Sequence, residues 1–178
     1  MNETANSPVK WLKYLLYVGI AAFLNYLLGG FLPETLSRWA GHAFSAAVLY
    51  PLLRLIPHNA RYKKALLFAG AALILNLLGI QSLALAASLC GIVGHFQEYY
   101  AHGELGARVE PALAGKWSIL FWIQFAVELM GFLLVNLLIP GGTVSAFAAM
   151  GTVAVSLVSV VLRVVYLVFL YRTIKAVE

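Results

Sequence analysis

A single carboxylate, Glu128, lies in the middle of the long apolar segment 117–139. A charged side chain at the centre of a lipid bilayer costs at least about 2.5 kcal/mol on insertion scales. Gln124 precedes Glu128 by one helical turn, so the two side chains share a helix face. We interpret this pair as the wall of a substrate or proton pathway. The alternative is a protonated glutamate that donates a structural hydrogen bond to a neighbouring helix.

Arg163, in the following apolar segment, is the natural candidate to pair with Glu128. The two residues lie at different distances from the connection between their segments. At about 1.5 Å per helical residue, this difference corresponds to roughly 13 Å of depth. The spacing therefore argues against a direct ion pair.

A second polar group follows the pattern His-x-x-Glu-x-x-x-His and consists of His95, Glu98 and His102. These spacings place two imidazoles and a carboxylate on one face of a helix. Such ligands suit a zinc ion or a non-haem iron ion, with open positions for water or substrate. Three ligands from one helix rarely enclose a metal unaided. The competing interpretations are therefore a structural polar cluster at a membrane interface and a surface for a substrate or partner.

Three asparagines, Asn25, Asn76 and Asn136, each precede a pair of leucines near the end of an apolar segment. They could form a polar ring at the outer mouth of a pathway, or they could make ordinary hydrogen bonds between helices. Their similar surroundings also suggest three helical hairpins built on a shared plan. Chance recurrence of Leu-Leu pairs would produce the same pattern.

The composition decides what kind of fold holds these residues. Of 178 residues, 62% are hydrophobic and 11% are charged, against roughly 25% charged in a soluble domain. The charges cluster between long apolar runs, which is typical of membrane helices. The sequence therefore predicts an all-α integral membrane protein, a bundle of about six transmembrane helices in a single domain over residues 10–171. Polar tails are expected at 1–9 and 172–178.

Turn and breaker residues divide the domain into its helices. The predicted helices are 10–32, 36–56, 64–80, 82–100, 117–139 and 143–171. Segment 36–56 contains Arg38 and Arg54, and Pro51 and Pro57 mark its far end, so an interfacial or re-entrant helix is the alternative there. A tight turn is expected around Gln81. Gly103 is expected to end the fourth helix near His102, which makes residues 101–116 the longest polar loop.

The basic residues predict the orientation in the membrane. Six spans bring nearly all of them to one side, together with both termini. They are Lys10, Lys13, Arg54, Arg61, Lys63, Lys64, Arg108, Lys116, Arg172 and Lys175. The positive-inside rule makes this side cytoplasmic, in a plasma (inner) membrane. Loops 57–63 and 101–116 would then face a membrane or cytoplasmic protein partner, and a homo-oligomer is a further option. Basic residues beside apolar segments do not form a nucleic-acid surface.

These patterns favour a small transporter, a channel or the membrane subunit of a transport complex that uses Glu128. A non-catalytic membrane scaffold or assembly partner is the alternative. A metal-dependent enzyme at His95, Glu98 and His102 is the least favoured class. The chain has no Walker loop, no G-x-S-x-G elbow and no H-E-x-x-H sequence, so the common phosphoryl-transfer and hydrolase chemistries lack their residues.

Overall fold

The computed structural model describes residues 7–137 and 146–178, with side-chain packing for 7–134 and 150–178. Its described part contains six α-helices and two short 3-10 turns, and no strand occurs in those residues. The helices are α1 (Pro8–Leu28), α2 (Glu34–Leu55), α3 (Arg61–Leu78), α4 (Ala84–Ala107), α5 (Ala112–Leu137) and α6 (Ala146–Val177). The predicted all-α class and the six helices are confirmed.

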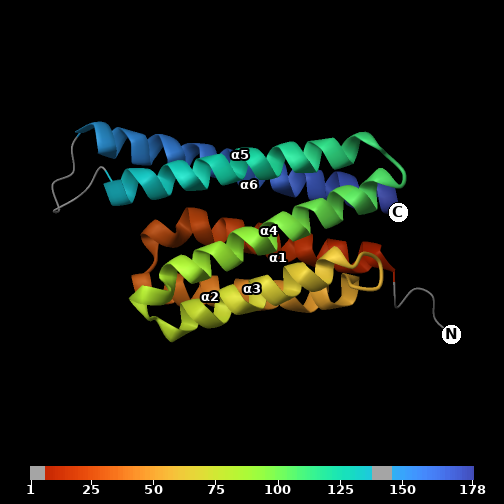
Figure 1. Ribbon diagram of the computed structural model, residues 1–178, viewed down its shortest axis with the longest axis horizontal. Coiled ribbons are helices and arrows are strands. Elements are labelled where there is room, and N and C mark those ends of the chain that lie inside the picture. The colour runs from red at the N-terminus through yellow and green to blue at the C-terminus, as the bar shows by residue number, and fades with distance from the viewer. Residues whose placement is uncertain (1–6, 138–145) are drawn as a thin grey trace.

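The helices run alternately up and down, and each one packs against the next (Figure 1). The helix α6 also contacts α1 and α4, which closes the bundle. As a result, α1 begins at the same end of the bundle at which α6 ends. We call this the basic end, because the lysine and arginine residues listed above lie at or near it. The opposite end, where α3 turns into α4, is the far end.

The short connections at the far end follow the predicted breakers. Gly79 ends α3 in the left-handed conformation with φ +65°, which glycine adopts without steric cost. A 3-10 turn over Gln81–Leu83 then leads into α4. The tight turn expected around Gln81 is therefore present. Segment 36–56, for which a re-entrant form was the alternative, is one continuous helix with the buried Pro51 inside it.

The predicted polar loop over 101–116 is wrong, because α4 continues to Ala107 and α5 begins at Ala112. Gly103 does not end the helix. A Cβ at this position would lie 3.2 Å from both Ala114 Cα and Trp117 Cβ, so the glycine lets α5 approach α4 closely. Only residues 108–111 separate the two helices. The backbone N–H of Glu110 donates to the carbonyl of Gly106 at 2.9 Å, which closes the end of α4.

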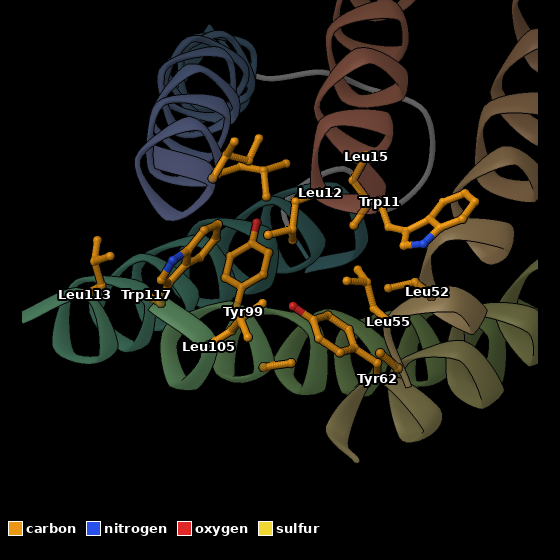
Figure 2. Packing of buried hydrophobic residues seen from close by; sticks show 14 of the residues in the cluster. Trp11, Leu12, Leu15, Leu52, Leu55, Tyr62, Tyr99, Leu105, Leu113 and Trp117 are labelled. Carbon is orange, nitrogen blue, oxygen red and sulfur yellow. The ribbon is translucent and has the colours of Figure 1, made fainter. Parts of the chain in front are cut away.

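The buried core lies toward the basic end of the bundle. All six helices contribute to it, with Leu12, Leu55, Tyr62, Tyr99, Trp117 and Leu170 among the most buried side chains. Figure 2 shows the side chains of Tyr62, Tyr99 and Trp117, from three different helices, in one cluster. The ring centroids of Tyr99 and Trp117 are 5.3 Å apart in an edge-to-face arrangement.

Outside this core, large apolar side chains are exposed along every helix. Examples are Leu24, Trp39, Ile74, Leu89, Met130 and Leu157. Three helices are long and apolar enough to cross a membrane: Pro8–Phe31, Ala112–Leu134 and Met150–Val177. The chain is therefore membrane-associated. The other three helices, α2, α3 and α4, are less clearly membrane-spanning by the same two properties.

Candidate functional site

A cavity of about 200 Å³ lies inside the bundle, at the inner margin of the core. Helices α1, α4, α5 and α6 supply most of its wall. Apolar residues of α1, among them Leu15 and Gly19, line one side. The polar residues come from the other three helices and are His95, Glu98, Tyr99, Gln124, Glu128, Arg163 and Tyr166. His95 and Glu98 of the polar group on α4 and Gln124 and Glu128 of the pair on α5 therefore line the same cavity.

Glu98 lies at the centre of a hydrogen-bonded cluster and is buried. Its Oε1 accepts a hydrogen bond from the Tyr166 hydroxyl at 2.8 Å and lies 3.4 Å from Nε2 of His102. Its Oε2 lies 3.7 Å from Nδ1 of His95. Three neighbours thus compensate this carboxylate, as a buried charge requires. The side chain of His95 is 52% exposed, in contrast to that of Glu98.

His102 extends this cluster toward the basic end. The ring is fully buried, and its Nδ1 lies 2.8 Å from the hydroxyl of Tyr62, which is also fully buried. When His102 is neutral, a proton on Nε2 faces Glu98, and Nδ1 accepts the Tyr62 hydroxyl proton. Tyr62, His102, Glu98 and Tyr166 therefore form one continuous line of hydrogen-bonding groups through α3, α4 and α6.

A second line of polar groups connects α4 to Glu128. The Tyr99 hydroxyl donates to Oε1 of Gln124, and Nε2 of Gln124 donates to Oε1 of Glu128 at 2.9 Å. The expectation that Gln124 and Glu128 share a helix face is met. Glu128 itself is exposed, and it lines the interior cavity as well as a groove on the outside of the bundle.

Arg163 reaches the same cavity as Glu128 despite the depth difference expected from their positions in the sequence. No ion pair joins the two side chains in the described part of the chain. The guanidinium instead lies over the ring of Tyr26, 4.5 Å from its centroid. Arg163, Glu128 and Tyr26 also line an adjoining cavity of about 120 Å³.

The arrangement of His95, Glu98 and His102 leaves little room for a metal ion. Both ring nitrogens of His102 already face partners, Tyr62 and Glu98. Among the residues that the structure describes, no group of three or more His, Cys, Asp or Glu side chains could hold a metal ion. The metal hypothesis stays a prediction without structural support.

The asparagine ring also stays a prediction. Asn25 is half-buried and Asn76 is exposed, and neither lines the cavities that contain Glu128. The side chain of Asn136 lies outside the described residues. The repeat of three helical hairpins that these asparagines suggest also stays a prediction.

Three tyrosines of the site, Tyr62, Tyr99 and Tyr166, were not among the predicted site residues. Tyr99 is adjacent to Glu98 and Tyr166 follows Arg163 by three residues, whereas Tyr62 is distant in sequence from every other site residue. That proximity is a weak signal, because tyrosine is also common wherever membrane helices meet water. Only the packing of the helices brings the Tyr62 and Tyr166 hydroxyls to the His102–Glu98 pair and the Tyr99 hydroxyl to Gln124.

At the basic end, Glu104 ties the connection between α2 and α3 to α4. Its carboxylate accepts hydrogen bonds from Arg61 at 2.6 Å and from Asn59 at 2.9 Å. Partial burial opposes ionisation, but these two donors outweigh it and hold the pKa of Glu104 below its ordinary value. Arg108 donates to the carbonyl of His58 at 2.9 Å, which fixes the same connection.

The chain matches no known protein-family model, and no curated protein or solved structure is significantly similar to it.

Proposed function

We propose that this protein is a small transporter or channel, or the membrane subunit of a transport complex, whose pathway passes through the Glu128 cavity. The observation that carries the proposal is the cavity itself. It places Glu128, Gln124 and Arg163 around about 200 Å³ of space inside a bundle of membrane helices. Ionisable residues within membrane helices are costly and usually mark a pathway for ions, protons or substrates.

In this proposal all six helices cross the membrane, with the basic end in the cytoplasm. Two features support it. The far-end connections at 29–33 and 79–83 are short, and of the basic residues only Arg38 lies close to either of them. The concentration of lysine and arginine at the other end matches the positive-inside rule.

Glu128 has the properties of the group that binds the transported cation or proton. One of its oxygens accepts from Gln124, and its side chain remains accessible from the cavity. Glu98, in contrast, is surrounded by His95, His102 and Tyr166 and is suited to hold α4 and α6 in place. The two carboxylates therefore have different roles.

The proposal is tested by reconstituting the purified protein into liposomes. Proton flux is followed with a trapped pH-sensitive dye under an imposed membrane potential, and cation uptake is followed with radiolabelled methylammonium. We expect Glu128→Gln to lower the active flux by about tenfold or more, since glutamine neither carries a charge nor binds a proton.

Glu34→Gln is the matched control, because Glu34 is an exposed carboxylate at the far end and does not line the cavity. It should leave the flux unchanged. If the wild-type protein moves neither protons nor methylammonium, or if Glu128→Gln behaves like Glu34→Gln, the proposal is wrong. A protein that moves neither protons nor methylammonium and copurifies with a partner chain would instead support the membrane-scaffold alternative.

A further inference from the structure

An apolar groove of about 410 Å³ runs along the outside of the bundle between α4 and α5. Leu85, Leu89 and Gly91 of α4 form one wall, and Phe125, Leu129 and Phe132 of α5 form the other. Most of these side chains are exposed, as are Leu89 at 54% and Leu129 at 45%. In a membrane, this groove faces lipid chains.

The groove exists because α4 and α5 diverge. Toward the basic end they are held together by Phe96 against Phe121, with ring centroids 5.0 Å apart, and by the hydroxyls of Tyr100 and Ser118 at 2.8 Å. Toward the far end the two helices move apart (Figure 1). Gly91 lies in this diverging part, and a Cβ added there would meet no atom within 4 Å.

The groove leads to the polar cavity. His95 and Glu128 line the groove, the interior cavity and a small pocket of about 10 Å³ between them. These two side chains thus stand at the boundary between a membrane-facing apolar surface and a polar interior. An exposed carboxylate next to lipid chains is costly unless it is protonated or meets a cation.

The polar interior also offers a positive group. Arg163 lines the interior cavity with Glu128 but does not pair with it, so an anion and a cation face the same space separately. Glu98 is compensated by its three neighbours and does not change this balance. The site therefore complements a group that carries both charges.

We propose that the groove and the cavity together bind a single-chain amphiphile with a zwitterionic head group. The acyl chain lies in the groove between α4 and α5, and the head group enters the cavity. The phosphate, which precedes the ammonium along the molecule, reaches Arg163 inside the cavity, and the ammonium group folds back to meet Glu128 at the groove boundary. The inference rests on the proposed function and names the substrate class of its pathway, which the amphiphile enters sideways from the bilayer.

The test uses native mass spectrometry of the intact protein in a non-ionic detergent, titrated with 1-palmitoyl-lysophosphatidylethanolamine as the probe. Palmitoyl-lysophosphatidylglycerol, which lacks the ammonium group, is the comparison lipid. We expect the wild-type protein to retain one ethanolamine lipid with about tenfold preference, the discrimination that about 1.4 kcal/mol provides. Glu128→Gln should remove this preference, and Arg163→Gln should weaken retention of both lipids.

A Cβ at Gly91 meets no atom within 4 Å, so the ring of Gly91→Phe can extend into the groove, and the variant should fold but retain less of both lipids. Gly70→Phe is its matched control, because Gly70 of α3 is equally open but does not line the groove. Equal retention of the two lipids by the wild-type protein, or equal behaviour of the two glycine variants, would overturn the inference. A protein that binds the ethanolamine lipid selectively but conducts no flux would refute the transport proposal and leave the lipid site standing.

Discussion

At the scale of single residues, the site separates a compensated carboxylate from an accessible one. Glu98 is buried among His95, His102 and Tyr166, whereas Glu128 accepts a hydrogen bond from Gln124 and lines the open cavity. Burial without partners would make Glu98 costly, so its neighbours are part of the stability of the bundle. Glu98 and Glu128 are both glutamates, and their different surroundings give the first a structural role and leave the second accessible to a ligand.

Tyr62→Phe tests this structural role. The substitution removes the hydroxyl that lies 2.8 Å from Nδ1 of His102 and leaves a buried nitrogen without its partner. The expected loss of stability is about 1–3 kcal/mol, the cost of an unsatisfied buried polar group. The measurement is the thermal unfolding midpoint in detergent.

Tyr17→Phe is the control for that measurement, because Tyr17 is 65% exposed on α1. It should leave the unfolding midpoint unchanged. Equal midpoints for the two variants would show that the Tyr62 hydroxyl contributes nothing to the folded state.

At the scale of elements, α4 organises the molecule. The helix packs against α3, α5 and α6. Its half nearer the basic end of the bundle carries Glu98 and His102, and its half nearer the far end forms a wall of the groove. Gly103 and Gly106 make the close crossing with α5 possible, since a Cβ at either position would crowd residues of that helix. The same crossing lets α5 bring Glu128 to the cavity.

Gly103→Leu is expected to disrupt this crossing. The added side chain would press against the backbone of Ala114, and overpacking of this kind costs about 1–3 kcal/mol. Gly115→Leu, on the neighbouring helix, is the matched control because nothing lies within 4 Å of a Cβ placed there. The comparison uses thermal unfolding together with the yield of monodisperse protein. A Gly103 variant as stable as the Gly115 variant would contradict the role assigned to this crossing.

At the scale of the whole molecule, the arrangement of charge and apolar surface determines how the bundle sits in a membrane. Most of the basic residues lie at one end, and exposed apolar side chains occur on the sides of all six helices. Three helices qualify as spans by length and hydropathy. The proposed topology adds α2, α3 and α4, which pack against these helices, as three further crossings.

Cysteine labelling tests the six-span topology directly. In a Cys90→Ser background, we expect Gln81→Cys to react with a membrane-impermeant maleimide from outside intact cells. Val109→Cys should react only after the membrane is permeabilised. Both positions are exposed and lie at opposite ends of α4. Labelling of both from the same side would show that α4 does not cross the membrane.

Much of this architecture could be predicted from the sequence, because the bilayer imposes a strong rule on composition. Apolar runs of about 20 residues separated by charges and breakers predict membrane helices without knowledge of their packing. The six helices and the turn at Gln81 follow from this rule. The prediction that Gly103 ends α4 was wrong, because glycine occurs both at helix ends and at positions where two helices pack closely.

Only the tertiary structure decided which polar residues meet. Depth counted along straight helices separated Glu128 from Arg163, yet both line one cavity. The spacing of His95, Glu98 and His102 suggested a metal site, yet His102 faces Tyr62 on a different helix. Periodicity determines the face of a helix on which a side chain lies. Helix tilt and the approach of neighbouring helices determine what that face meets, and these depend on packing between segments far apart in the chain.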